Sequence, residues 1–258
     1  MKAAQRGIQS IEVGGALLRA LAHHGRALPL KELAAEAGMS PAKAHPYLVS
    51  FGKLGLIEQD ADSGRYGLGP LAMQLGLISL QQSDPVALAT PLIEPLAVRT
   101  GHTVAVAVWG NRGATIVRIA QPPSAVHVSM RHGTVMSLSG TASGRLFAAW
   151  LPAAVVRAAF ALERGAEGGA DRKTKAVPAA ELQAIREQGF SAVQGLLLPG
   201  ISAIAAPVFD GSGALALSLT AIGPTPTFDE RAGGAVAKPL LEAAAGLSAR
   251  LGFRNIQR

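Results

Sequence analysis

The chain has 258 residues, which suits one large domain or two modest ones, and 49% of them are hydrophobic, enough for a sizeable core. Its net charge of +7 permits a polyanionic partner, but residues 1–75 hold only eight Lys and Arg against six Asp and Glu, so charge alone does not indicate DNA binding. The absence of cysteine excludes disulfides, thiolate metal sites and cysteine nucleophiles.

The start of the chain and its most apolar stretch bear on membrane attachment. Residues 1–7 have no apolar stretch after their charges, so we expect no secretory signal and a cytoplasmic protein without a membrane partner. Residues 146–162 contain Pro152 and Arg157 and are short for a membrane span, so they predict two buried helices instead.

Two helices are predicted before residue 40. Ser10 is a candidate N-cap for the first helix, which ends at Gly25, and the pair Gly14-Gly15 would permit close packing. The second helix follows Pro29 and stops at Gly38. Apolar residues recur at helical spacing, with Ile11, Leu17, Leu18 and Leu21 in the first helix and Leu30, Leu33, Ala34 and Ala37 in the second.

A third helix and a hairpin are predicted next. Ser40 caps the helix, Pro41 occupies its first position, and Gly55 terminates it. Residues 56–59 and 65–68 flank a polar turn and predict a β-hairpin. The expected apolar face of the helix consists of Ala44, Tyr47, Leu48, Phe51 and Leu54.

The remaining chain mixes helices and strands. A helix over 70–81 is expected to link two parts, and Asp84-Pro85 marks the boundary between them. The order of elements predicts an α+β domain with an antiparallel sheet. We expect a helix at 91–99, strands at 103–109, 114–120 and 125–129, helices within 142–162 broken at Pro152, a mobile loop at 165–175, a helix at 178–188, strands at 201–209 and 215–222, and a closing helix at 228–251.

The turn between the second and third helices favours DNA binding. Gly38-Met39-Ser40 would set the two helices at a fixed angle, and the small side chain of Ala34 lets them approach. With the following hairpin, this is the order of a winged helix-turn-helix, which places its second helix in a major groove. An ordinary helical hairpin is the alternative interpretation.

Segments along nearly the whole chain resemble the IclR family of bacterial transcription regulators. The resemblance implies a winged helix-turn-helix over 1–69, a linker helix over 70–84 and a GAF-like effector-binding domain over 85–258. It also implies a repressor or activator that forms homodimers, often paired into tetramers. The segments that carry it are 30–34, 44–45, 54–57, 64–69, 139–145, 200–201, 204–210 and 223–224.

The resemblance and helix position together assign contacts with double-stranded operator DNA. Two of these assignments have alternatives: Lys31 could be a solvated surface charge, and His45 could simply be exposed. Base edges would be contacted by Ala42, Lys43 and His45, phosphates by Lys31 and Ser40, and the DNA backbone or minor groove by Arg65.

Pro46 is a departure from the family pattern, because many members carry an Arg or another polar residue there. Proline lacks a backbone N–H and clashes with the preceding turn, at a cost of about 3 kcal/mol inside a helix. We therefore expect a kinked or late-starting third helix, and weaker or altered sequence reading than an arginine would give.

The resemblance also implies an effector pocket. The turn 140–144 opens a predicted helix whose free N–H groups could bind a carboxylate by donating hydrogen bonds to it, although a purely structural helix cap is the alternative. The candidate effector-binding residues are Ser129, Met130, Ser143, Gly144, Ile201, Ser202, Ala203, Thr220 and Ile222.

Residues 189–200 are a second departure, because many members have an acidic cluster there and this chain has the apolar run 196–198. Ala203 also stands where other members have Cys. The hypothesis is an aromatic or otherwise bulky, partly apolar metabolite. Packing of the three leucines in the core or at a dimer interface remains the alternative.

Patterns that suggest enzyme chemistry are weak. Residues 67–72 resemble a dinucleotide fingerprint, but a parallel βαβ unit is missing around them and Pro70 removes an N–H. Ser143 does not lie in a nucleophile elbow, and no Asp or Glu occurs from 101 to 162 to complete a metal site with His127 and His132. No catalytic residue, cofactor or metal is therefore predicted. The alternative function is a small-molecule-binding protein or enzyme that uses the helix-turn-helix only for assembly.

Overall fold

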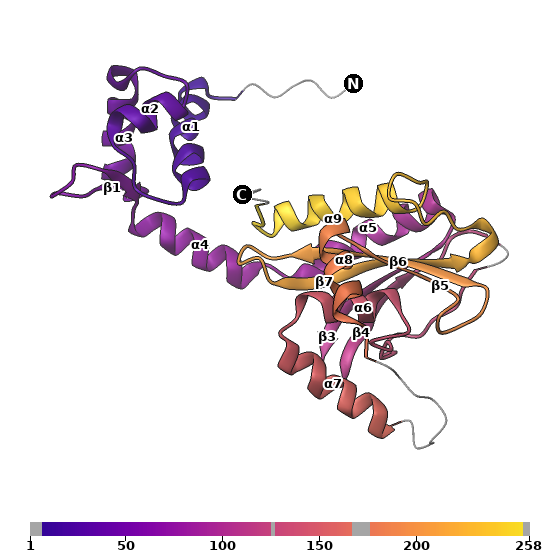
Figure 1. The fold of residues 1–258 in the computed structure, drawn as a ribbon. Helices are drawn as coiled ribbons and strands as arrows, with labels where there is room; N and C mark the ends of the chain where they lie inside the picture. The colour runs from indigo at the N-terminus through magenta and orange to yellow at the C-terminus, as the bar shows by residue number, and fades with distance from the viewer. Residues whose placement is uncertain (1–6, 125–126, 167–175, 255–258) are drawn as a thin grey trace. The chain divides into compact units, whose positions relative to one another are not determined.

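The computed structural model describes residues 7–124, 127–166 and 176–254. The chain divides into two compact units between Ser83 and Asp84, and each unit is described by itself. Figure 1 traces both units and labels their helices and strands.

The N-terminal unit is a three-helix bundle with a hairpin and one further helix. Helix α2 leads into α3 through the left-handed residue Gly38, at φ +68°. Strands β1 and β2 pair antiparallel, with Ile57 opposite Leu68. The elements are α1 (Gln9–His24), α2 (Leu30–Glu36), α3 (Pro41–Lys53), β1 (Ile57–Gln59), β2 (Tyr66–Leu68) and α4 (Pro70–Gln82).

The core of this unit confirms most of the expected apolar faces. Gly14 lies where α1 crosses α3, because a Cβ there would come within 2.9 Å of the Tyr47 ring and 3.0 Å of the Phe51 ring. Leu54, expected on the apolar face of α3, is instead 60% exposed, since the helix ends at Lys53. The buried residues are Leu17, Ala20, Leu21, Leu28, Leu33, Ala34, Ala44, Leu48, Ile57 and Tyr66.

The predicted cap of α1 is wrong. The helix starts at Gln9, with Ile8 as the N-cap and no side-chain cap hydrogen bond, so Ser10 lies within the first turn. By contrast, the Ser40 side chain caps α3 as predicted and accepts a hydrogen bond from the Lys43 N–H at 3.3 Å.

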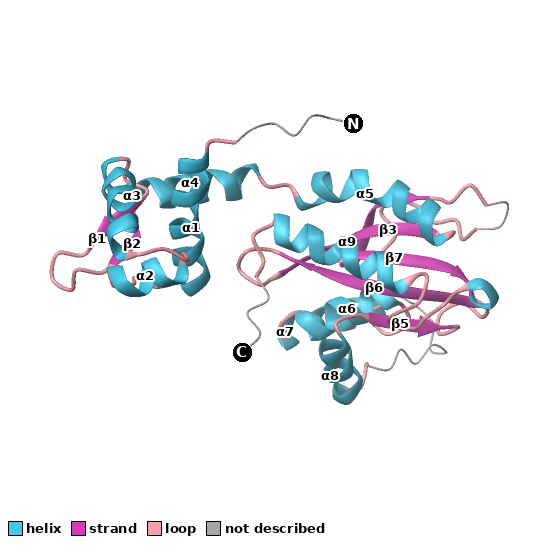
Figure 2. Ribbon diagram, turned by 90° about the horizontal axis from the view of Figure 1, so that it is seen from above, coloured by secondary structure: helices cyan, strands magenta, loops and turns pink. Residues whose placement is uncertain are grey.

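The C-terminal unit is built on an antiparallel sheet with strand order β4-β3-β7-β6-β5. Helices α5 and α9 lie along one face and α6 on the other (Figures 1 and 2). Its elements are α5 (Pro85–Thr100), β3 (Thr103–Gly110), β4 (Gly113–Ala120), α6 (Ala142–Trp150), α7 (Ala153–Ala166), α8 (Ala179–Gln188), β5 (Ser191–Gln194), β6 (Ile201–Phe209), β7 (Leu215–Pro224), a short 3-10 turn (Thr225–Thr227) and α9 (Ala237–Arg250).

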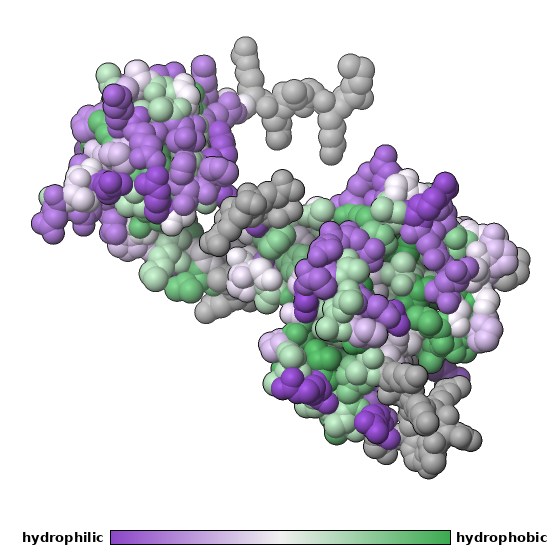
Figure 3. All heavy atoms as spheres, in the orientation of Figure 1, coloured by the Kyte–Doolittle hydropathy of each residue, from purple (hydrophilic) through white to green (hydrophobic). Residues whose placement is uncertain are grey.

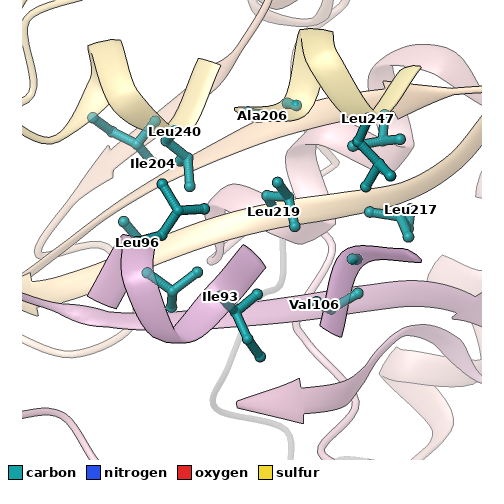
Figure 4. Close-up of a cluster of buried hydrophobic side chains, with 14 of the residues drawn as sticks. Ile93, Leu96, Val106, Ile204, Ala206, Leu217, Leu219, Leu240 and Leu247 are labelled. Atoms are coloured by element: carbon teal, nitrogen blue, oxygen red, sulfur yellow. The ribbon is translucent and has the colours of Figure 1, made fainter. Parts of the chain in front are cut away.

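The main core of this unit lies between the sheet and the helix pair α5 and α9. Figure 4 shows side chains of α5, α9 and the strands β3, β6 and β7 converging there. Because side chains alternate along a strand, Leu217, Leu219 and Ala221 of β7 pack in this core, while Ser218, Thr220 and Ile222 face α6. The residues labelled in the figure are Ile93, Leu96, Val106, Ile204, Ala206, Leu217, Leu219, Leu240 and Leu247.

Two expected helices start at other residues, and one strand was not expected. Helix α5 starts at Pro85 rather than at 91, because the Asp84 carboxylate accepts hydrogen bonds from the N–H groups of Val86 and Ala87. The closing helix starts at Ala237 rather than at 228, since a 3-10 turn and the loop around Asp229 precede it. Strand β5 was not predicted, because four residues are too few for a clear alternation.

The strand expected over 125–129 is wrong where the structure describes it, at 127–129. The edge of β4 is bridged instead by residues 133–136, through the Thr115–Val135 bridge and the bond from the Met136 N–H to the Ala114 carbonyl. The Val128 carbonyl accepts a hydrogen bond from the Thr103 hydroxyl at 2.7 Å. A side-chain donor therefore satisfies this carbonyl in place of a backbone N–H of a neighbouring strand.

The apolar stretch 146–162 breaks into two helices at Pro152, as predicted, but only α6 is fully buried. On α7, Val156 and Ala159 are buried while Leu162 is 58% exposed. Most of the loop expected over 165–175 lies outside the described residues, and Gly165 and Ala166 end α7. Within the described residues, no helix is long and apolar enough to cross a membrane.

His102 anchors the turn that follows β7. Its ring is 6% exposed, lies 3.2 Å from the Thr227 carbonyl through Nε2, and contacts the Phe228 ring. Burial lowers the pKa of the imidazole below its ordinary value, against the opposing effect of the hydrogen bond to Thr227. The neutral ring therefore donates to the carbonyl near pH 7, and the residue acts as a structural group.

Candidate functional site

The solvent-facing side of α3 holds the residues predicted to read DNA. Ala44 and Leu48 are buried in the core of this unit, whereas the neighbouring Ala42, Lys43 and His45 are turned outward and exposed. In helix-turn-helix proteins the N-terminal residues of the second helix approach base edges. The structure thus brings the predicted base-reading residues together on one free surface.

Helix α3 does not start late, so the late start expected from Pro46 is wrong, while the alternative of a kink at Pro46 stays a prediction. Pro46 is the sixth residue of a helix that begins at Pro41, and its carbonyl accepts from the Ser50 hydroxyl at 2.9 Å. Since proline has no N–H, the Ala42 carbonyl lacks its usual donor four residues along the helix.

The remaining predicted DNA contacts lie at the edges of this surface. The Ser40 hydroxyl is occupied as an acceptor by the helix cap, and Lys31 is exposed. Arg65 is also exposed, on the hairpin, with Nη1 3.5 Å from the Ala27 carbonyl. The hairpin tip carries Asp60, whose pKa is lowered by hydrogen bonds from the Ser63 hydroxyl and N–H. Because this carboxylate repels phosphate, Arg65 is the residue through which the hairpin can attract it.

The C-terminal unit contains a cavity of about 360 Å³ on the α6 side of its sheet. This volume falls within the range of pockets for small ligands. Strands β6 and β7 contribute one wall, the loop before α6 another, and the apolar run after β5 a third. The lining residues are Val128, Ser129, Met130, Arg131, Thr134, Val135, Met136, Ser137, Gly140, Thr141, Ala142, Ser143, Val193, Leu196, Leu197, Leu198, Ile201, Ala203, Thr220 and Ile222.

Most of the predicted effector residues line this cavity, and two do not. Ser202 alternates with Ile201 and Ala203 along β6, so its side chain points to the opposite face of the sheet. There it donates a 2.6 Å hydrogen bond to the Glu230 carboxylate. Those that line it are Ser129, Met130, Ser143, Ile201, Ala203, Thr220 and Ile222.

Gly144 has a packing position instead. A Cβ at this position would overlap the Ser137 carbonyl oxygen and lie 2.7 Å from the Leu138 Cα. The glycine therefore allows the loop before α6 to run directly against the helix. The Thr141 side chain caps α6 by accepting from the Gly144 N–H at 3.0 Å. The N–H groups of Ala142 and Ser143 remain in the first turn, where they face no helical acceptor.

The part of the loop before α6 that follows Met130 was not predicted from the sequence, and it includes Arg131, Thr134 and Ser137. No periodic pattern marks this stretch, so only the fold brings it over the sheet. The apolar run 196–198, by contrast, was singled out from the sequence. Its leucines are 43–56% exposed in the single chain and border the cavity, so the packing of this unit's core does not account for them.

Comparisons with known proteins agree with a helix-turn-helix unit followed by a unit with a ligand-sized cavity. The family model described as the IclR helix-turn-helix domain matches residues 10–61, and the model described as the bacterial transcriptional regulator IclR C-terminal matches residues 78–249. The crystal structure of HmgR from Pseudomonas aeruginosa superimposes with a TM-score of 0.86 at 37% identity, covering 96% of this chain and 100% of that one.

Curated relatives have the same kind of function. The glycerol operon regulatory protein of Streptomyces coelicolor is 32% identical over 207 residues, which cover 80% of each chain. The DNA-binding transcriptional repressor YiaJ of Escherichia coli is 26% identical over 251 residues, covering 96% of this chain and 89% of that protein.

A winged helix-turn-helix joined to a unit with a ligand-sized cavity defines a ligand-responsive, DNA-binding transcription regulator. The chain belongs to the IclR family. Its relatives are regulators rather than enzymes, and nothing in the comparisons supports the alternative of an enzyme that uses the helix-turn-helix for assembly.

Proposed function

We propose that this chain acts in the cytoplasm as a repressor that leaves its operator when a partly apolar metabolite fills the cavity. In this proposal residues 1–69 bind DNA, residues 70–84 link, and residues 85–258 bind the effector. The observation that carries the DNA part is the free outer surface of α3, with Lys43 and His45 exposed beside the capped helix start. Repression is supported by the relative YiaJ, a DNA-binding transcriptional repressor.

The effector part of the proposal depends on the lining of the cavity. Leu196, Leu197 and Leu198 make one wall apolar, and Val128, Met130 and Met136 add further apolar surface. A ligand with an aromatic or branched apolar group should bind such a wall more tightly than a short oxoacid does, because the binding energy rises with the apolar area buried. The free N–H groups at the start of α6 would donate hydrogen bonds to an oxygen of the ligand.

The test of the proposed function is a titration of the full chain into fluorescent duplex DNA from upstream of its own gene, followed by anisotropy. We expect tight binding whose affinity falls steeply with salt, because phosphate contacts release counterions. A random duplex of the same length serves as the control. Equal, weak binding to both duplexes at low ionic strength would contradict the proposal.

Replacing Pro46 by arginine is expected to tighten operator binding by about tenfold. The change restores a backbone N–H inside α3 and adds a long donor on its exposed surface, where an arginine can pair with guanine. Pro46→Ala separates the two effects, because it restores the N–H without adding a base-reading side chain. Unchanged affinity of the arginine variant in the anisotropy titration would contradict this expectation.

Helix α4 supports a homodimer. Its sequence from Pro70 to Gln82 contains no charged residue, and it exposes Met73 (70%), Leu75 (52%) and Leu77 (54%) to solvent. Figure 3 shows green, hydrophobic residues over this helix, next to the mostly purple surface of the three-helix bundle. Exposed apolar surface of this kind is typical of interfaces. The occupant we propose is α4 of a second copy, because helix-turn-helix proteins bind paired half-sites as dimers.

We expect the chain to sediment as a dimer and Met73→Glu/Leu77→Glu to sediment as a monomer at micromolar concentration. Both changes place a charge in apolar surface that the dimer would bury. The control is Gln74→Glu, which adds a charge to the same helix at a polar, exposed position and should leave the dimer intact. A double variant that remains dimeric would exclude α4 from the interface.

A further inference from the structure

Arg131 is the only charged residue among the described residues that line the cavity. No Asp or Glu lines it, and the sequence has none between 101 and 162. Other arginines of this unit have carboxylate partners, such as Arg145 with Glu181 at 2.8 Å and Arg99 with Glu242 at 3.5 Å. In the part of the chain that the structure describes, no carboxylate pairs with Arg131.

The unpaired guanidinium of Arg131, beside a largely apolar wall, favours a ligand of opposite charge. In the free protein the Arg131 side chain is exposed and hydrated. A ligand that fills the cavity displaces part of this water, and a partly dehydrated charge is costly unless an opposite charge replaces the water. A neutral ligand would not compensate for the lost hydration of the charge. A carboxylate would, because its two oxygens match the geometry of the guanidinium.

The buried side of the cavity is also arranged to donate hydrogen bonds. Ser218, Thr220 and Ser143 are each at most 2% exposed and form a chain, with Oγ–Oγ1 distances of 3.4 Å from Ser218 to Thr220 and 2.8 Å from Thr220 to Ser143. Either hydroxyl can be the donor in each pair, and Ser218 does not line the cavity. When Ser218 donates to Thr220 and Thr220 donates to Ser143, the Ser143 hydrogen is available to an acceptor inside the cavity.

We propose that Arg131 makes the cavity selective for a carboxylate ligand, which pairs with the guanidinium while its apolar body lies against Leu196–Leu198 and an acceptor reaches the Ser143 hydroxyl. A cavity of about 360 Å³ lies near the lower end of the range for small-molecule pockets, so a small acid is expected. The inference rests on the proposed effector site, but it does not depend on DNA binding.

The experiment is isothermal titration calorimetry of the full-length protein without DNA, using acids and their matched amides. The probes are benzoate and benzamide, octanoate and octanamide, and 4-phenylbutyrate and 4-phenylbutyramide. We expect at least one of the two larger acids to bind saturably, and its amide to bind about tenfold or more weakly. Glyoxylate tests the short-oxoacid alternative and should bind more weakly than the larger acids.

Two substitutions of Arg131, one control arginine and one substitution of Ser143 test whether the preference for acids depends on Arg131. Arg131→Gln should weaken the acid by about tenfold and bring it close to its amide, while Arg131→Lys should retain part of the preference. The control is Arg118→Gln, which removes an exposed arginine from β4 outside the cavity and should change neither affinity. Ser143→Ala should weaken both members of a pair, since it removes a neutral donor.

Some outcomes would overturn the inference. They are equal binding of acid and amide, unchanged acid binding by Arg131→Gln, or no saturable binding of any acid up to about 10 mM. If the protein does not bind duplex DNA but prefers acids over their amides in an Arg131-dependent way, the proposed repressor function is refuted and this inference is supported. A protein that binds its operator but shows no preference for the acids would do the reverse.

Discussion

Gly144→Ala is expected to lower the free energy of unfolding of the C-terminal unit by about 3 kcal/mol and its melting temperature by roughly 10 °C. The new methyl group would overlap the Ser137 carbonyl oxygen and approach the Leu138 Cα to 2.7 Å. Backbone atoms cannot turn aside as a flexible side chain can, so the loop before α6 must shift. Circular dichroism during thermal and urea unfolding measures the effect.

Gly246→Ala is the matched control for this substitution. Gly246 also lies within a helix, α9, but a Cβ there would meet no atom within 4 Å. Alanine is favoured over glycine inside a helix by up to about 1 kcal/mol, so this variant should be slightly stabilised. If Gly144→Ala were as stable as Gly246→Ala, the close packing of the loop on α6 would be disproved.

Lys43→Glu is expected to weaken operator binding by about 10- to 100-fold. Lys43 is exposed in the first turn of α3, on the surface that also presents Ala42 and His45. The change removes a donor that can reach a base edge and places a carboxylate against the phosphates, so both specific and salt-dependent contacts are lost. The anisotropy titration at two salt concentrations measures both losses.

Lys53→Glu makes the same change of charge at the other end of α3. Lys53 is exposed as well, but it lies in the last turn, away from the helix start that approaches base edges. We expect a much smaller loss of affinity, similar for the operator and for a random duplex. Equal losses from the two variants would show that α3 contributes charge without reading sequence.

Local signals in the sequence predicted the fold best where a side chain or a glycine determines the backbone. Ser40 followed by Pro41 marked the start of α3, and Gly38 marked the turn before it. Ser10 failed as a cap because a hydroxyl near a helix start is only a candidate until the backbone selects the first turn. Asp84 was predicted as a boundary, and the second unit does begin there, but its role as the N-cap of α5 was not foreseen.

The cavity was predictable only in part, because its walls come from segments far apart in the chain. The alternation along β6 could have excluded Ser202, since Ile201 and Ala203 were already assigned to the pocket and neighbours in a strand face opposite ways. Arg131 could not be found in this way. It lies in an irregular loop, and its place beside the cavity depends on how residues 133–136 bridge β4.

Under the proposed function, Pro46 would affect recognition in a second way, separate from the donor that its side chain lacks. The Ala42 carbonyl, left without a partner four residues along the helix, is an acceptor provided by the main chain on a solvent-facing turn. In the major groove the exocyclic amino groups of adenine and cytosine are donors. Substitutions at residue 42 leave this oxygen in place, so an amino-bearing base beside it would be preferred whichever side chain is present there.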